Sequence, residues 1–244
     1  MAITTQSAQT QTFTILHTFN GTDGGFPFAA MIRGTDGYLY GTTINGGNAG
    51  TVFKINPGGA LTTVYSFCSR SNCSDGAYPA ASVFEGTDGN FYGTTDATGS
   101  FGENLGTVFK LTPSGVLTTL HRFSNPKKGG AFPGAGVIEA TDGNFYGTTE
   151  SDGSASSGEV FKVTPKGEFT VLHSFCSVSG CADGQNPLAP LLQAADGDLY
   201  GTTEGGGTTG DGTVFKITTG GALTTLYNFC SLSNCADGVG PFGG

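Results

Sequence analysis

A segment of 17 residues occurs four times along the chain, with small variations on "PFAAMIRGTDGYLYGTT", and its copies begin at Pro27, Pro79, Pro133 and Pro187. The tyrosine of the "YGTT" motif falls at Tyr40, Tyr92, Tyr146 and Tyr200, so the repeat spacings are 52, 54 and 54 residues. A unit of this length cannot cover its own apolar faces, and stable repeat proteins bury them by stacking neighbouring units. The sequence therefore predicts one repeat architecture instead of two unrelated domains.

Each unit contains four short runs rich in Val, Ile, Thr, Phe and Tyr, separated by Gly, Asp, Asn and Pro. In the first unit the runs are residues 29–34, 38–43, 51–55 and 61–67. Such runs and separators are typical of strands and turns, and the "DG" between the first two predicts a hairpin. Four antiparallel strands in about fifty residues is the pattern of a propeller blade. We therefore predict an all-β fold, a β-propeller of four four-stranded antiparallel blades.

The ends of the repeat array are out of phase with the units. Residues 1–11 are polar and predict a flexible tail. Residues 12–244 are predicted to form a single propeller domain, in which a spare outer strand (12–19, containing "FTILHTF") precedes four units of about 52–56 residues. The last unit already has its own outer strand, so one strand is surplus, and unpaired edges invite association. We expect a closed four-bladed monomer. The alternative is half of an eight-bladed ring formed by a dimer, with self-association through surplus edge strands.

The connections differ in how strictly their lengths are kept. The proline and the last threonine of the 17-residue segment are 16 steps apart in every copy, and the step from the Val of "VFK" to the closing Phe is always 15. The second-to-third connection spans 9 to 13 steps, and the connection to the next unit spans 8 to 12. In an up-and-down blade these two variable connections lie on one face, where loops tolerant of length commonly carry function.

The variable connections hold eleven of the 19 acidic residues and three basic ones, in a chain of net charge -9. This acidic face is expected to repel nucleic acid and anionic polymers. Because of this charge we predict no nucleic-acid partner. No apolar run is long enough for a membrane helix, so we also predict no membrane span.

Two rings of residues on the variable face are candidate binding sites. The first precedes the proline of each unit and consists of Phe26, Tyr78, Phe132 and Asn186, which suit stacking on sugar rings unless they pack between blades. The second follows "GTT" and contains Asp96, Glu150 and Glu204, with Ile44 in the first unit. Three converging carboxylates would bind a cation, and calcium is the one cofactor that this pattern suggests; the alternative is three solvated side chains.

Nothing in the sequence predicts catalytic residues. The chain lacks a serine-hydrolase elbow, a zinc-protease motif, a P-loop and an EF-hand loop. His17, His121 and His173 stand where other units have Tyr65 and Tyr227, which indicates a packing position.

The six cysteines form three local pairs, Cys68 with Cys73, Cys176 with Cys181, and Cys230 with Cys235. Their spacing predicts three disulfides and an oxidising compartment, with zinc as the less favoured alternative because no histidine lies nearby. We therefore expect a secreted, extracellular protein, although the N-terminal residues lack the features of an export signal.

The motifs "DGNFYGTT", "GTVFKLTPSGVLTTL" and "YSFCSRSNCSDGAYP" resemble the GloVer tandem repeats, named for Gloeobacter and Verrucomicrobia, across residues 12–244. The strand order is more distantly similar to an NHL-type blade, which implies that the first strand is innermost. The resemblance implies a secreted or surface-anchored bacterial protein and no established activity. The cysteine pair is absent after Phe19 and Phe123.

Three classes of function remain open. The favoured one is a non-enzymatic secreted module that binds a glycan or cell-surface polymer through the variable face. The second is a structural, self-assembling extracellular repeat protein. The third is a metal-assisted polysaccharide lyase or lactonase, whose residues would come from separate blades.

Overall fold

The computed structural model describes residues 13–96, 105–124, 130–151 and 156–242. The predicted tail over residues 1–11 lies outside these ranges. No helix in the described ranges is long and apolar enough to cross a membrane.

Sixteen strands form four antiparallel sheets, each with its strands in chain order. The strands of blade 1 are β1 (Ile32–Arg33), β2 (Leu39–Thr43), β3 (Thr51–Ile55) and β4 (Leu61–Ser66). Blade 2 consists of β5 (Phe84–Glu85), β6 (Phe91–Thr95), β7 (Thr107–Leu111) and β8 (Leu117–Arg122). Blade 3 consists of β9 (Val137–Glu139), β10 (Phe145–Thr149), β11 (Glu159–Val163) and β12 (Phe169–Ser174). Blade 4 consists of β13 (Leu192–Gln193), β14 (Leu199–Thr203), β15 (Thr213–Ile217) and β16 (Leu223–Asn228). The predicted four blades of four strands are confirmed.

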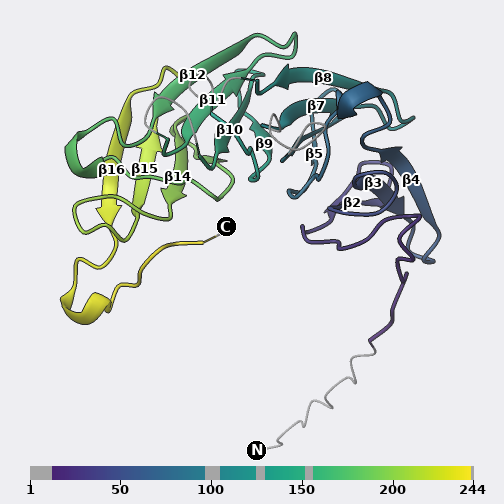
Figure 1. The fold of residues 1–244 in the computed structure, drawn as a ribbon, viewed down its shortest axis with the longest axis horizontal. Coiled ribbons are helices and arrows are strands. Elements are labelled where there is room, and N and C mark those ends of the chain that lie inside the picture. The colour runs from purple at the N-terminus through teal and green to yellow at the C-terminus, as the bar shows by residue number, and fades with distance from the viewer. Residues whose placement is uncertain (1–12, 97–104, 125–129, 152–155, 243–244) are drawn as a thin grey trace, which may run out of the picture.

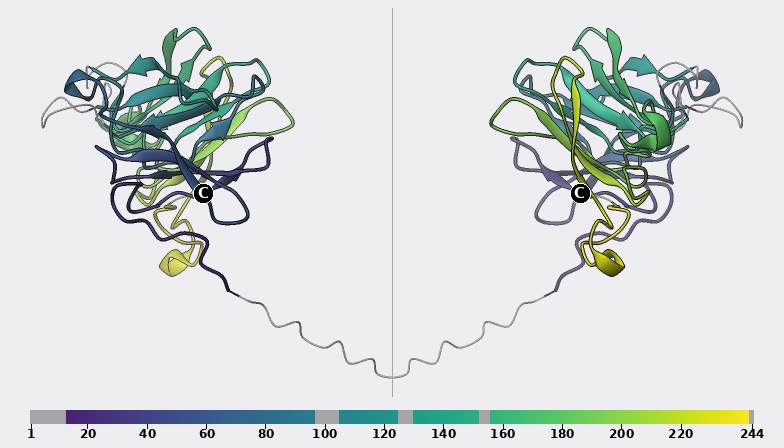
Figure 2. Two further views of the ribbon diagram at one scale, coloured as in Figure 1. Left: turned by 90° about the vertical axis from the view of Figure 1, so that its right-hand side faces the viewer. Right: turned by 90° about the vertical axis from the view of Figure 1, so that its left-hand side faces the viewer.

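The blades follow one another along an arc that stays open between blade 1 and blade 4 (Figures 1 and 2). Within each blade the first strand lies on the inner side of the arc and the fourth on the outer side (Figure 1). Three apolar clusters join blade 1 to 2, 2 to 3 and 3 to 4. Among the described residues no cluster joins blade 4 to blade 1, so the expected closed ring of four is not formed within one chain.

Every junction between blades uses the same set of side chains. One blade contributes the Tyr of "YGTT", the Val of "VFK" and the closing Phe, as in Tyr92, Val108 and Phe123 of blade 2. The next blade contributes aromatic and aliphatic residues from its own second and third strands, as in Phe145 and Phe161 of blade 3. These side chains are at most 2% exposed. Alternation along the third strand explains this division, because Val and Phe of "VFK" point to opposite faces of the sheet.

The closing Phe of one blade meets the "VFK" Phe of the next edge to face. The ring centroids of Phe67 and Phe109 are 5.1 Å apart, and those of Phe175 and Phe215 are also 5.1 Å apart. Such pairs contribute about 0.5–1.5 kcal/mol beyond the area that they bury. The aromatic positions therefore set the spacing between blades as well as the core.

Hydrogen bonds between neighbouring blades, which we call latches, accompany this packing on the face where the turns have constant length. The Thr35 hydroxyl and amide donate to the Glu85 carboxylate at 2.6 and 2.9 Å, and Thr87 makes the same two bonds to Glu139. The aspartate of each "DG" turn serves the same face, because it accepts a bond from the tyrosine hydroxyl of its own blade; the pairs are Asp36–Tyr40, Asp88–Tyr92, Asp142–Tyr146 and Asp196–Tyr200. These aspartates therefore have a structural role in each blade.

The N-terminal segment, residues 13–19, lies beside blade 1 without pairing in any sheet. Its Phe19 ring stands 5.1 Å from Phe53 at 68°. This is the position that a closing Phe takes against the following blade, so the segment replaces the outer strand of a blade that would precede blade 1. At the other end of the segment the Phe13 side chain is 88% exposed, so it is not covered by a blade.

We expect Phe161→Ala to lower the free energy of unfolding by about 3–5 kcal/mol, because it opens a cavity in a junction where rings from two blades meet. Denaturant unfolding followed by far-UV circular dichroism measures the loss. The control is Val116→Ala in an exposed turn, expected to change stability by no more than about 0.5 kcal/mol. Equal losses in both variants would contradict the packing described above.

Candidate functional site

The two predicted rings lie on one face and are paired residue by residue. Backbone N–H groups of the second ring donate to carbonyl groups of the first, at distances of 2.9–3.1 Å; the pairs are Ile44–Phe26, Asp96–Tyr78, Glu150–Phe132 and Glu204–Asn186. Each blade therefore presents an aromatic or amide side chain beside the residue that follows "GTT". We call the first ring, Phe26, Tyr78, Phe132 and Asn186, the collar.

All four collar residues have a left-handed backbone, with φ between 55° and 58°. This region suits asparagine, but it is rare and strained for Phe and Tyr, with a typical cost of about 1–3 kcal/mol. Backbone bonds from the preceding blade hold the conformation: the N–H groups of Tyr78, Phe132 and Asn186 donate to loop carbonyls at 2.8–3.1 Å. The chain thus maintains a strained conformation at the same position in every blade.

The strained backbone turns the aromatic collar side chains toward solvent. Phe26 is 75% exposed, Tyr78 42% and Phe132 37%. This exposure does not fit the alternative in which the collar packs between blades. Asn186 differs, because its side-chain amide donates to the backbone carbonyl of Glu150 at 3.1 Å and so joins blade 4 to blade 3.

The collar borders a shallow trough along the inner side of the arc. The trough has a volume of about 400 Å³ and is lined by the inner segments of all four blades. Its walls are mostly Ala, Gly and Ser, and the largest of the other lining side chains are Phe28, Phe84 and Leu188. Because each collar residue directly precedes the proline that starts an inner segment, the collar lies at one rim of the trough.

The carboxylates of the second ring have unequal surroundings. Asp96 is largely buried and its Oδ1 has no hydrogen-bond partner among the described residues. Burial, together with a smaller contribution from the negative charge of Glu150 in the next blade, raises the pKa of Asp96 to about 6. Glu150 and Glu204 are exposed.

The three carboxylates do not come together as one ligand set. Among the described residues, Asp211 with Cys230 and Cys235 is the single group of three potential ligands whose atoms all lie within 4.8 Å of one another. Those two sulfurs are joined in a disulfide, so this group is not a metal site. A cation at Asp96, Glu150 and Glu204 stays a prediction, and the electrostatic coupling of Asp96 with Glu150 is the part of the set that the structure brings together.

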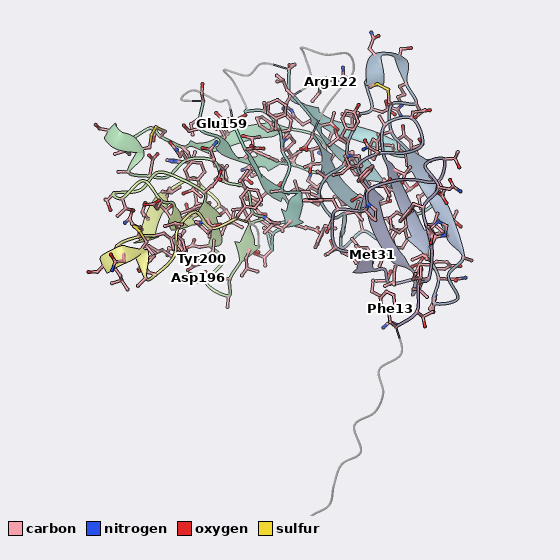
Figure 3. All side chains as sticks on the ribbon, turned by 60° about the horizontal axis from the view of Figure 1, so that its bottom comes forward. Phe13, Met31, Arg122, Glu159, Asp196 and Tyr200 are labelled. Carbon is pink, nitrogen blue, oxygen red and sulfur yellow. A yellow bond between two sulfur atoms is a disulfide. The ribbon has the colours of Figure 1, made fainter. Side chains whose placement is uncertain are left out.

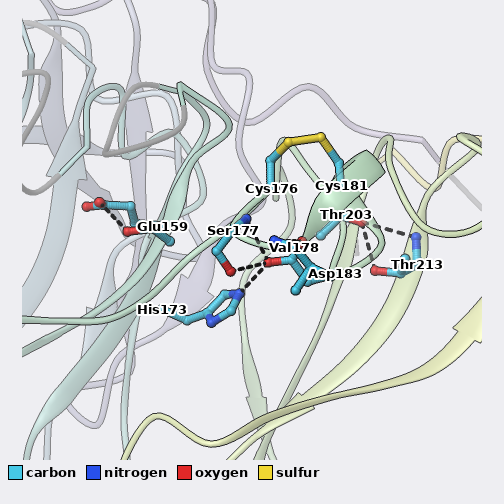
Figure 4. A network of polar contacts seen from close by, with 10 residues as sticks. Glu159, His173, Cys176, Ser177, Val178, Cys181, Asp183, Thr203 and Thr213 are labelled. Atoms are coloured by element: carbon cyan, nitrogen blue, oxygen red, sulfur yellow. Dashed lines mark hydrogen bonds and ion pairs between the residues drawn. A yellow bond between two sulfur atoms is a disulfide. The ribbon is translucent and has the colours of Figure 1, made fainter.

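Cysteine loops precede two of the collar residues, Tyr78 and Asn186, and a third follows blade 4. The three predicted disulfides are present, Cys68–Cys73, Cys176–Cys181 and Cys230–Cys235, and each encloses a short 3-10 turn; these are η1 (Ser71–Cys73), η2 (Ser179–Cys181) and η3 (Ser233–Cys235). In the second loop the Asp183 carboxylate accepts bonds from Ser177 and from His173 Nε2 (Figure 4). In the first, Asp75 is fully buried and accepts from Tyr65 and Ser69.

These contacts explain the interchange of His and Tyr in the fourth strands. His17, Tyr65, His173 and Tyr227 each bond to a loop aspartate, namely Asp23, Asp75, Asp183 and Asp237. His121 instead stacks on Phe169 at a centroid distance of 3.8 Å, and burial lowers its pKa to about 4. The histidines are therefore structural, as predicted. Several loop acids are also structural, so the charge that faces solvent is smaller than the sequence count indicates.

Comparison with known families accounts for the repeat. The profile of the Gloeobacter/Verrucomicrobia repeat matches residues 2–182 and 103–244, which together span nearly the whole chain. The chain belongs to the Gloeobacter/Verrucomicrobia repeat family. A search of the curated proteins finds no match.

Solved structures similar to this repeat protein are propellers. The extracellular domain of a protein described as a hybrid two component system from B. thetaiotaomicron aligns with a TM-score of 0.58 and 14% identity, over 87% of this chain and 24% of that one. TolB from Acinetobacter baumannii aligns with a TM-score of 0.53 and 15% identity, over 89% of this chain and 46% of that one. The family member thus spans less than half of each of these chains, and at such identities the likeness shows the fold alone.

Asp96→Asn is expected to stabilise the protein at neutral pH and not in acid. The pKa of Asp96 is raised from 3.8 to about 6 in the folded state, so the folded state holds the proton more tightly and loses stability as the pH rises through this interval. The gain of the variant at pH 7.5 is about 2–3 kcal/mol, and it vanishes near pH 3.5. Denaturant unfolding at both pH values measures the difference.

Glu150→Gln is the matched variant, because it removes the second cause of the shift while leaving Asp96 in place. It should give a smaller gain of the same sign at pH 7.5. A gain for Asp96→Asn that is equal at both pH values would contradict this account of the carboxylate.

Proposed function

We propose that this protein is a non-enzymatic extracellular binding module that holds a neutral or cationic glycan, or a similar cell-surface polymer, on the collar. The observation that carries the proposal is the collar itself, in which three blades expose an aromatic ring from a strained backbone at one equivalent position. Strain retained at a repeated position is a recognised mark of a functional site.

Sugar rings fit this arrangement chemically. The apolar face of a pyranose stacks on an aromatic ring, and its hydroxyl groups donate to nearby carboxylates and carbonyls. The collar supplies the aromatic rings. Asp96 and Glu150, whose backbone N–H groups donate to the carbonyl groups of Tyr78 and Phe132, supply carboxylate acceptors next to these rings. The trough along the inner segments gives a linear polymer room to continue beyond the rings.

Charge narrows the class of polymer. The net charge of the chain is -9, and two acidic residues of the second ring, Glu150 and Glu204, are exposed beside the collar. Sulfated or uronic polymers would be repelled, whereas amino sugars and uncharged glycans would not. Three disulfides and the likeness to an extracellular domain support a location outside the cell.

The test is a polysaccharide and glycan array probed with the purified protein, followed by calorimetry on each hit. Phe26→Ala and Tyr78→Ala are each expected to weaken binding about two- to tenfold, because stacking on one aromatic ring contributes about 0.5–1.5 kcal/mol. The matched control is Phe13→Ala, an exposed aromatic residue distant in sequence from the collar, which should leave binding unchanged.

The same binding measurement with and without a chelator decides the role of a cation, since loss of binding on chelation would assign one to the Asp96 and Glu150 region. Absence of binding to every glycan on the array would overturn the proposal. Release of sugar products from a bound polymer would also overturn it, in favour of an enzyme.

A further inference from the structure

Among the described residues, blade 4 lies at one end of the arc and carries the joining side chains of a junction with no blade packed against them. Tyr200, Val214 and Phe229 occupy the positions of Tyr146, Val160 and Phe175, which are fully buried in the junction with blade 4. All three of the terminal residues are partly exposed. Leu192, Leu226 and Tyr227 nearby are 68%, 49% and 39% exposed, so the end of the arc is an apolar face and not a polar cap.

Blade 1 begins the arc with the opposite half of a junction. Phe53 and Ile55 correspond to Phe109 and Leu111, which receive Tyr40, Val52 and Phe67 in the first junction. On blade 1 the N-terminal segment covers this side incompletely, and a cavity of about 490 Å³ remains between the segment and residues including Met31, Phe53 and Leu61. Figure 3 shows Phe13 and Met31 at this end, while Asp196 and Tyr200 lie on blade 4.

The polar contact that accompanies each internal junction has different residues at the two ends of the arc. In the first two junctions a threonine donates to a glutamate, as Thr87 does to Glu139, and in the third the Thr141 N–H donates to the side chain of Gln193. At the ends, the threonine position is Ala195 and the glutamate position is Arg33, which is exposed. Beside Ala195, blade 4 carries Asp196, which accepts a bond from the Tyr200 hydroxyl, and Asp198, which forms an ion pair with Lys216 at 2.8 Å. A junction between the ends would bring the Arg33 guanidinium toward the Asp196 carboxylate.

We propose that blade 4 of one copy docks on blade 1 of a second copy in the geometry of the internal junctions, so that two copies close an eight-bladed ring about a twofold axis. A twofold ring contains two identical junctions of this kind, and both ends of each chain are used. The open arc, with its end blades on either side of the gap, has the shape that this arrangement requires (Figure 1).

The N-terminal segment is an internal competitor for this junction. Phe19 lies against Phe53 as Phe175 lies against Phe215, and both pairs have centroids 5.1 Å apart. In the ring, Phe229 of the second copy takes the place of Phe19, so residues 13–19 must leave blade 1. The segment is poorly held, since Ile15 and Leu16 are 68% and 42% exposed and no ladder bonds it to a sheet.

The C-terminus already has the course of a connection into a further blade. The Cβ that would be added to Gly212 meets Pro241 at 2.8 Å, as the ones at Gly50, Gly106 and Gly158 meet Pro79, Pro133 and Pro187. Pro241 thus sits where the first proline of a following unit sits. The C-terminal segment therefore packs on blade 4 as the internal connections pack on blades 1 to 3.

The experiment is sedimentation equilibrium on the full chain from micromolar to millimolar concentration, comparing two equivalent phenylalanines. Phe19→Ala weakens the competitor and should lower the dimer dissociation constant about tenfold or more. Phe229→Ala removes the ring that docks and should raise it by a similar factor. Thermal unfolding at low concentration confirms that both variants fold.

The charge arrangement has its own test. Arg33→Glu should weaken the dimer, because it places a carboxylate opposite Asp196. Adding Ala195→Thr and Asp198→Asn to that variant recreates the chemistry of the internal latch and should restore dimerisation.

Each alternative outcome overturns the proposal. A monomer at every concentration in both the parent chain and Phe19→Ala would exclude the junction. Equal effects of Phe19→Ala and Phe229→Ala would indicate unspecific apolar association. A series of species larger than the dimer would indicate an open filament instead of a closed ring.

Discussion

The contact between an aromatic ring that closes one blade and the "VFK" ring of the next is the interaction on which the rest of this structure depends. It recurs as Phe67 on Phe109, Phe123 on Phe161 and Phe175 on Phe215, with centroids 5.1–5.5 Å apart. A sheet of four short strands has two apolar faces and cannot bury either alone. Stability is therefore a property of junctions, and each blade is ordered to the extent that a neighbour covers it.

This dependence on junctions explains where the chain can vary. The turns on one face are tied to the junctions through the Thr–Glu latches and the Asp–Tyr bonds, so their lengths are fixed. The connections on the other face need only return the chain to the next inner segment. The collar exists on that second face because bonds from the preceding blade hold a strained backbone that an isolated loop would release.

Much of the fold could be predicted because it follows from local pattern. The strands, the hairpins at "DG" and the disulfides depend on residue type and spacing within a unit, and all were identified from the sequence. The open arc was not predicted. The angle between blades depends on the side-chain volumes at all three junctions, and the pattern of a single unit does not contain this information. The internal and terminal units look alike at the level of motifs, so closure could not be separated from continuation.

The sequence indicated candidate residues for a site, but it did not indicate their backbone conformation, their pairing or their burial. The pairing of the collar with the second ring depends on backbone bonds between segments about 18 residues apart, as in Tyr78 and Asp96. The burial of Asp96 depends on the blade that follows it, which the sequence of one unit does not contain. One signal was present, however: Asn186 shares a position with Phe26, Tyr78 and Phe132, and asparagine is the residue that favours a left-handed backbone.

The dependence of stability on junctions also helps to interpret the residues of blades 1 and 4 that differ from those at the internal junctions. A blade whose face is exposed to water is expected to carry polar side chains there, as capping repeats do. Blade 4 keeps Tyr200, Val214 and Phe229, and blade 1 keeps Phe53 and Ile55. The residues that change are the latch pair, which becomes Arg33 at one end and Ala195 beside two aspartates at the other. Retained apolar faces with a substituted polar contact are what a junction between separate copies requires, because the apolar faces supply the contact and the charges select the partner.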